Sequence, residues 1–233
     1  MTDKPVVVIL GAGMGGRGVA QALSPAHHLV VVDQSIEAAQ KACDIAVAAG
    51  GSAEPAAVNL TDLVAVQQFC ADLIKAHQHV DAVIHLVGGW AGSPTVDDKA
   101  IQQFGQLVPG IVTTVQTTTV GFLDALASAP NGRYIMVTST AVATPTKGNA
   151  AYAAAKSAAE SWVRSTGNAL EGTPARAYIV AVMALVDEAT RVANPDKDYS
   201  RFTDVVDLGN SIGRLLTDGS LEQGSYVDLT TGA

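Results

Sequence analysis

Short apolar runs alternate with longer amphipathic segments along the whole chain. The runs predict seven buried strands, at about residues 6–10, 29–32, 56–58, 81–87, 133–137, 177–182 and 226–229. Stretches with helical spacing lie between them, the clearest at about residues 35–49, 63–76, 150–170 and 203–216. This alternation predicts a doubly wound parallel sheet of about seven strands, with helices on both faces. We expect one α/β domain over residues 1–233.

The segment before the fifth strand is harder to interpret. Its pattern predicts one helix at about residues 97–104 and a threonine-rich one at about 107–126. Pro109 stands near the start of the second helix, where a proline is tolerated.

Composition is that of a folded domain with a large core. Hydrophobic residues make up 48% of the 233 residues and charged residues 15%, and the net charge is −8. A net negative charge argues against nucleic acid and anionic membrane surfaces as partners. No apolar run reaches the ~18 residues of a membrane span, and the start lacks a signal-peptide pattern.

Cysteine usage points to a reducing compartment. Cys43 and Cys70 have no metal-ligand spacing and are interpreted as buried apolar residues or free thiols. We therefore expect a cytoplasmic protein without a metal ion.

The first predicted strand ends in a glycine-rich turn. Gly11, Gly13 and Gly16 match the pattern Gly-x-Gly-x-x-Gly, with Met14 inside it, and helical sequence begins at about residue 19. Glycines at such a turn let backbone N–H groups approach a pyrophosphate at a helix N-terminus. A Rossmann-type dinucleotide site is the functional interpretation; a plain tight turn is the alternative.

An acid follows the second predicted strand. Asp33 can hydrogen-bond both ribose hydroxyls of an adenosine and would repel a 2′-phosphate, so NAD is favoured over NADP. Its structural alternative is an acid at the N-terminus of the next helix.

Further candidates stand at the carboxyl ends of other strands. Asn59, with Leu60, could meet an adenine edge or form a turn, and Gly88 would let a cofactor pass close to the backbone. Trp90 is interpreted equally as a hydrophobic plug or a substrate contact. His85, inside a strand, is expected to be a hydrogen-bonded core histidine.

The alanine-rich stretch 150–156 carries a phenol and an ammonium four residues apart. On a helix, Tyr152 and Lys156 would share one face. A nearby ammonium favours the phenolate, so we expect Lys156 to lower the pKa of Tyr152 from about 10. Ser139, after the fifth strand, could hydrogen-bond a substrate oxygen. The alternatives are an ordinary surface Tyr and Lys, and a polar strand terminus.

Taken together, these motifs resemble the short-chain dehydrogenase/reductase family over nearly the full length. The resemblance implies that Tyr152 donates or accepts a proton, that Lys156 lowers its pKa and holds the nicotinamide ribose, and that Ser139 orients the substrate oxygen. A hydride would pass between NAD(H) and a carbonyl or alcohol. The expected cofactor contacts are Gly11, Gly13, Met14, Gly16, Asp33, Asn59, Leu60, Val87, Gly88, Tyr152, Lys156, Leu185 and Thr190.

The chain departs from the family pattern in several places. Leu10 precedes Gly11 where the family has Thr-Gly, and four residues rather than three separate Gly11 from Gly16. The family's Asn-Asn-Ala-Gly is His-Leu-Val-Gly at residues 85–88, and its Pro-Gly after the sixth strand is Val-Met at 182–183. The family's catalytic Asn should fall near residues 109–111, where none occurs. We expect the accompanying helix distortion to remain, with Pro109 removing a helical hydrogen bond.

Two other functions are compatible with these residues. Gly-Gly-Trp-Ala-Gly at residues 88–92 resembles the dihydropteridine reductase branch, which prefers NADH. A non-catalytic dinucleotide-binding redox sensor is the second. The resemblance also implies a homodimer or homotetramer, formed through the long helices, that acts on a small molecule.

Overall fold

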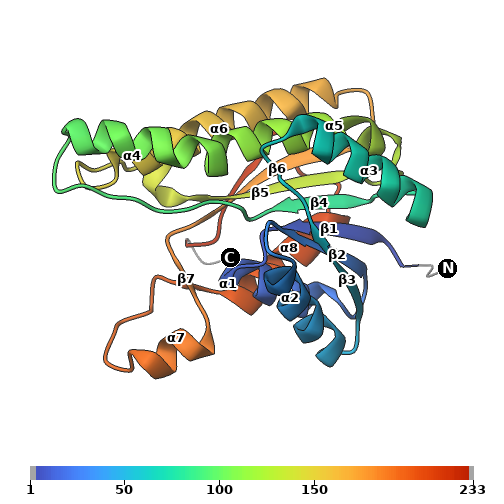
Figure 1. Ribbon diagram of the computed structural model, residues 1–233, viewed down its shortest axis with the longest axis horizontal. Helices are drawn as coiled ribbons and strands as arrows, with labels where there is room; N and C mark the ends of the chain where they lie inside the picture. The colour runs from blue at the N-terminus through green and yellow to red at the C-terminus, as the bar shows by residue number, and fades with distance from the viewer. Residues whose placement is uncertain (1–3, 231–233) are drawn as a thin grey trace.

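The computed structural model describes residues 4–230 as a three-layer α/β fold (Figure 1). Its main sheet has seven parallel strands in the order β3-β2-β1-β4-β5-β6-β9. The strands are β1 (Val6–Leu10), β2 (His28–Asp33), β3 (Ser52–Ala57), β4 (Ala82–His85), β5 (Arg133–Ser139), β6 (Arg176–Val182) and β9 (Tyr226–Asp228). The predicted doubly wound sheet is confirmed. Residues 1–3 and 231–233 of the expected domain lie outside the described residues.

Helices cover both faces of this sheet (Figure 1). One face carries α3 (Leu63–His77), α4 (Asp98–Val108), α5 (Thr114–Ser128) and α6 (Ala150–Ala169), and the other carries α1 (Met14–Leu23), α2 (Ile36–Ala48) and α8 (Val205–Thr217). Strand side chains alternate between the two apolar clusters: Val6, Val8 and Leu10 join one, Val7 and Ile9 the other. Burial on both faces explains why β1 is an unbroken apolar run.

The third strand differs from its prediction. β3 begins at Ser52, within the expected turn, and ends at Ala57, so that Val58 lies outside it. The strand is at the edge of the sheet and contains Glu54 and Pro55. An edge strand tolerates proline and charge, and it therefore lacks the apolar signature of the central strands.

The first helix begins earlier than its sequence indicates. α1 starts at Met14 and includes three glycines, although glycine disfavours helix interiors. Tertiary contact accounts for the third: a Cβ on Gly18 would lie 2.4 Å from the Cβ of Val205 in α8. Close packing of α1 on α8 thus overrides the local propensity.

The region around Pro109 is one helical run rather than two separate helices. α4 passes into the π-helical turn η1 (Pro109–Thr113), which passes into α5. Proline has no N–H to donate, and the Thr114 N–H bonds to the Pro109 carbonyl across five residues. Both predicted ranges are helical, but the predicted break between two separate helices was wrong. The predicted distortion is present at η1.

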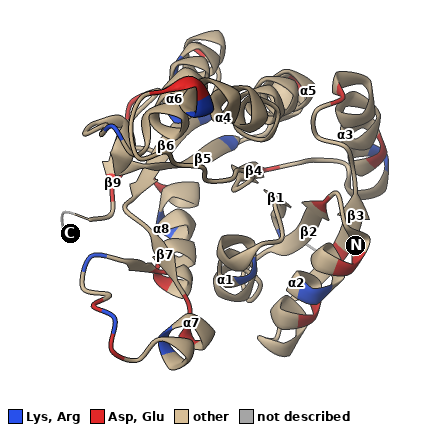
Figure 2. Cartoon of the chain, turned by 60° about the vertical axis from the view of Figure 1, so that its left-hand side comes forward, with Lys and Arg blue, Asp and Glu red and all other residues tan. Residues whose placement is uncertain are grey.

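The segment after β6 forms a small excursion from the main body (Figure 1). It contains β7 (Leu185–Val186), α7 (Glu188–Ala193) and β8 (Thr203–Asp204), and β7 pairs with β8. Figure 2 shows charged residues along this segment and on α2 and α3, whereas the strands are mostly uncharged.

Among the described residues, no helix has both the length and the apolar character needed to cross a membrane.

Candidate active site

In the turn between β1 and α1, the glycine backbone packs closely against itself and against the backbone that follows β4. Gly11 has φ 99°, and a Cβ there would lie 3.1 Å from the Val87 nitrogen. A Cβ on Gly16 would lie 1.9 Å from the Gly11 carbonyl oxygen, so only glycine fits that position. Gly13, by contrast, has no neighbour within 4 Å of a Cβ, so space is open beside the first residue of α1. The open N-terminus of α1 is suited to an anionic group.

Asp33 ties this turn to the end of β2. One carboxylate oxygen accepts a hydrogen bond from the Ala12 N–H at 2.8 Å, and the other accepts from the Ser35 N–H at 3.1 Å. The Ser35 side chain, not that of Asp33, caps α2. Asp33 is therefore a half-buried acid between the turn and the surface.

A cavity of about 450 Å³ opens at the carboxyl ends of β1, β2 and β4. Its size is within the range of small-molecule and cofactor sites. Its lining consists of Gly11, Gly13, Asp33, Gln34, Val58, Asn59, Leu60, Thr61, Leu86, Val87, Gly88, Pro109, Gly110 and Thr114. The structure thus brings the expected adenosine-binding positions together around one space.

Asn59 forms a turn and also lines the cavity. Its carboxamide oxygen accepts hydrogen bonds from the Thr61 N–H at 3.1 Å and the Thr61 hydroxyl at 2.7 Å. Its amide nitrogen is therefore the group left to meet a ligand. Leu60 is buried, and its carbonyl accepts a hydrogen bond from Thr117 of α5, which anchors this loop.

A second cavity, of about 460 Å³, contains Ser139 and Tyr152. Ser139 ends β5 and Tyr152 lies in the first turn of α6. The lining consists of Trp90, Ser139, Thr140, Ala141, Thr144, Thr146, Asn149, Tyr152, Met183, Ala184 and Arg201. Trp90 is 72% exposed, which contradicts its interpretation as a hydrophobic plug and leaves it on the rim.

The electrostatics of Tyr152 differ from the expectation. Burial raises the pKa of Tyr152, and a hydrogen bond with Ser139 lowers it by less. Lys156 was expected to lower this pKa, but its ammonium is buried and donates to the Val137 carbonyl at 3.0 Å. Helical spacing sets the Cα positions of the pair; it does not fix where the long lysine side chain ends.

Lys156 acts on its buried neighbours. Burial lowers its pKa to about 8, and the Glu160 carboxylate, one turn later on α6, opposes that shift. Burial, aided by the Lys156 charge, lowers the pKa of His85 to about 3, so His85 is neutral. A Cβ on Gly88 would lie 3.5 Å from the Lys156 Nζ, so this ammonium lies close to a residue that lines the first cavity.

His85 belongs to a buried polar chain at the helix distortion. Its Nε2 lies 3.0 Å from the Thr114 hydroxyl, which donates to the Gly110 carbonyl at 2.9 Å. The expectation of a hydrogen-bonded core histidine is confirmed. These hydrogen bonds hold η1 at residues 109–111, where the sequence has no Asn.

Three expected cofactor residues gather beside α1 but line neither cavity. The Thr190 hydroxyl lies 3.8 Å from the Met14 sulfur, although the two residues are 176 positions apart. A Cβ on Gly15 would lie 2.9 Å from Leu185 Cδ1. Met14, Leu185 and Thr190 therefore form one wall next to the glycine turn.

Several lining residues were not expected from the sequence. Gln34, Thr61 and Thr114 line the first cavity, and Asn149 and Arg201 the second. Thr114 could have been predicted from the sequence, because it stands four residues after the Pro-Gly pair at 109–110 inside a helical segment. No sequence feature predicted Arg201, since it lies in an irregular loop.

A protein-family model described as short chain dehydrogenase matches residues 5–197 of this chain. No curated protein matches the sequence.

Solved structures share the fold at low sequence identity. A short chain dehydrogenase from Mycobacterium smegmatis is 18% identical with a TM-score of 0.81, covering 99% of this chain and 93% of that one. A short-chain type dehydrogenase/reductase from Mycobacterium ulcerans is 17% identical with a TM-score of 0.83, covering 98% and 89%. An NAD⁺-bound xylitol dehydrogenase is 18% identical with a TM-score of 0.84, covering 98% of both chains. At these identities the likeness concerns the fold.

The glycine turn generates a stability prediction. Gly16→Ala should lower the free energy of unfolding by about 1–3 kcal/mol, because its Cβ would overlap the Gly11 carbonyl. Gly13→Ala is the matched control: its φ is −66° and its Cβ meets open space, so stability should be unchanged. Urea unfolding measures both, and equal losses in the two variants would contradict the packing role of Gly16.

Proposed function

We propose that this chain, which belongs to the short-chain dehydrogenase family, is an NAD(H)-dependent oxidoreductase acting on a carbonyl/alcohol pair, with Tyr152 as acid/base. The observation that carries the proposal is the joint placement of Ser139 and Tyr152 in one cavity. The second support is the neighbouring cavity, with its glycine turn and Asp33. The buried Lys156 ammonium lies beside Gly88, which lines that neighbouring cavity.

The protonation state of Tyr152 favours carbonyl reduction at neutral pH. Because burial raises its pKa, the phenol keeps its proton and can donate it to a carbonyl oxygen. Ser139 would orient that oxygen from the end of β5. When bound, the nicotinamide supplies the hydride. Lys156, with a pKa of about 8, is mostly charged at neutral pH and would hold a ribose hydroxyl.

The second cavity also indicates a substrate class. Arg201 is the one charged side chain among the described residues that line it, and it is exposed. A guanidinium on the rim favours carbonyl compounds that carry a carboxylate or another anionic group. We therefore include keto acids beside neutral ketones, aldehydes and a quinonoid dihydropterin in the activity panel below.

Tyr152→Phe tests the acid/base role. We expect NADH oxidation with the best carbonyl substrate to fall by about 100-fold or more, because general acid catalysis contributes that much. Absorbance at 340 nm measures turnover, and tryptophan fluorescence measures NADH binding, which should be retained. Tyr226→Phe, a partly exposed tyrosine of β9, is the control.

Each outcome has a definite meaning. Wild-type turnover in Tyr152→Phe would show that the assigned role is wrong. Turnover with the dihydropterin alone would favour a dihydropteridine reductase. Tight NADH binding without turnover on any substrate would favour a redox sensor.

Asp33→Asn tests the proposed preference for NAD. The carboxylate should repel the 2′-phosphate of NADP, whereas an amide of the same size should not. We expect the NADH-to-NADPH ratio of kcat/KM to fall about tenfold, or about 1.4 kcal/mol. Asp44→Asn makes the same charge change on the exposed face of α2 and should leave the ratio unaltered. An equal ratio in Asp33→Asn and the wild type would refute the assignment.

We also propose that α5 and α6 form the contact between copies of the chain. They expose Val120 and Trp162 beside a shallow hollow of about 240 Å³. The Trp162 indole donates to the Thr119 hydroxyl at 2.8 Å, which fixes the ring on this face.

Light scattering should therefore find a dimer or tetramer. Val120→Glu should shift the oligomeric state toward a monomer, because burying an unpaired charge at the contact is unfavourable. Val192→Glu, on the exposed surface of α7, should not. A monomeric wild type would contradict the proposal.

A further inference from the structure

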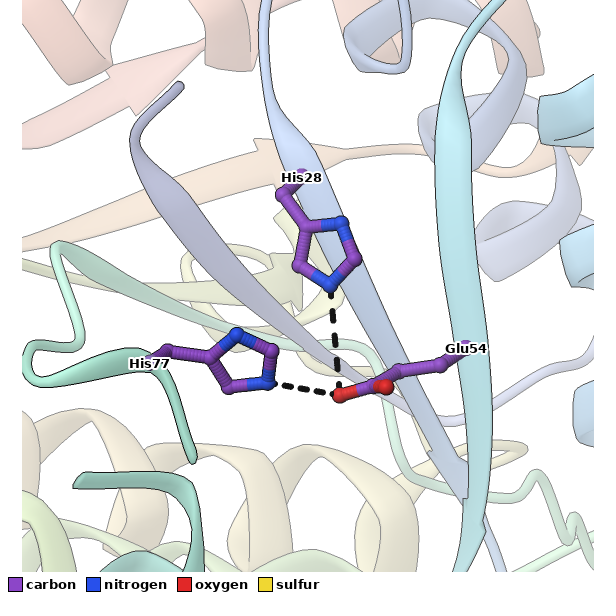
Figure 3. Close-up of side chains that lie close together, drawn as sticks. All are labelled: His28, Glu54 and His77. Atoms are coloured by element: carbon purple, nitrogen blue, oxygen red, sulfur yellow. Dashed lines mark hydrogen bonds and ion pairs between the residues drawn. The ribbon is translucent and has the colours of Figure 1, made fainter. Parts of the chain in front are cut away.

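Three side chains with metal-binding atoms converge at the edge of the sheet, away from both cavities. His28 begins β2, Glu54 lies in the edge strand β3, and His77 ends α3. Figure 3 shows both imidazoles directed at the same Glu54 carboxylate oxygen. His28 and Asp33 stand at opposite ends of β2, which places the cluster about 16 Å from the first cavity along the strand.

The distances within the cluster are those of a compact site. His77 Nε2 lies 2.7 Å from Glu54 Oε1, and His28 Nε2 lies 3.9 Å from the same oxygen. One ligand atom from each residue falls within 4.8 Å of the others. Ligand atoms around a tetrahedral zinc ion are about 3.3 Å apart. Only small side-chain movements would therefore be needed to place a metal ion among them.

One buried nitrogen in the cluster makes no hydrogen bond to any described residue. His28 Nε2 is shielded from solvent and makes no hydrogen bond within the described part of the chain. Its other nitrogen, Nδ1, lies 3.0 Å from the Ser52 hydroxyl. If Nδ1 donates to Ser52, a lone pair on Nε2 faces a lone pair on the Glu54 oxygen. Such a hydrogen bond on the far nitrogen is how metal-ligating histidines are normally oriented.

The surroundings suit a metal ion that enters from solvent. The two histidine side chains are 13% and 17% exposed, whereas that of Glu54 is 47% exposed. Two of the ligands stand on paired strands, where His28 faces Ser52 in the register, so the backbone positions are rigid.

We propose that His28, Glu54 and His77 bind a zinc-type divalent cation, with a water molecule as fourth ligand, and thereby pin the end of α3 to the sheet edge. Two imidazoles and one carboxylate suit Zn²⁺ and the later first-row metals, whereas Mg²⁺ and Ca²⁺ prefer oxygen ligands. No metal-ligand motif can be recognised in the sequence, because the three residues come from separate elements and the two histidines are 49 positions apart.

Metal titration of the full chain tests the proposal. After chelator treatment and dialysis, ZnCl₂ should bind in one equivalent and raise the melting temperature, whereas MgCl₂ at the same concentration should do neither. CoCl₂ should give visible absorption bands from a site of low coordination number. These readouts do not depend on enzymatic activity. Absence of a zinc-dependent rise in melting temperature would overturn the proposal.

Matched variants locate the site. His77→Gln and Glu54→Gln should each weaken zinc binding at least about tenfold and abolish the cobalt bands. His79→Gln is the control, since His79 lies 3.2 Å from Asp81 in a separate histidine–acid pair. Ser52→Ala, which removes only the partner of His28 Nδ1, should weaken zinc binding while the chelated protein keeps its melting temperature. Zinc affinity equal to wild type in both His77→Gln and Glu54→Gln would refute the site.

Discussion

The close approach of Gly16 to the Gly11 carbonyl is the constraint on which the site depends. Because no side chain stands between them, α1 can begin directly above the end of β1 and direct its free N–H groups outward. Asp33 then reaches the Ala12 N–H and closes the turn against β2. The first cavity forms around this junction, since the other strands of the parallel sheet end at the same edge.

A second constraint is the buried ammonium of Lys156. An isolated charge in an apolar interior is very unfavourable, so its surroundings must compensate it. The Val137 carbonyl accepts a hydrogen bond from it, and the buried carboxylate of Glu160 opposes the effect of burial on its pKa. The same positive charge helps keep His85 neutral. One side chain of α6 therefore influences the charge state of its buried polar neighbours.

The sequence predicted the central strands and the strand-end residues well, for a physical reason. Strands such as β1 are buried on both faces, so their apolar runs are continuous, and catalytic and binding groups of such sheets collect where the strands end. The edge strand β3 has no such signature, and α1 begins within glycines because packing on α8 outweighs propensity. Arg201 and the cluster around Glu54 depend on contacts between distant elements, which no local pattern encodes.

The pKa of Tyr152 could not be predicted from its four-residue spacing to Lys156. A spacing of four residues on a helix places two side chains on one face. From that spacing alone, the Lys156 ammonium should be the main influence on the pKa of the Tyr152 phenol. In the folded chain, the Lys156 ammonium donates a hydrogen bond to the Val137 carbonyl instead. Burial of the phenol is then the largest influence on the pKa of Tyr152. A pKa depends on where the charge ends and on how much water is excluded, and neither follows from helical periodicity. The raised pKa of Tyr152 is consequently a property of the packed site, and it keeps the phenol protonated at neutral pH.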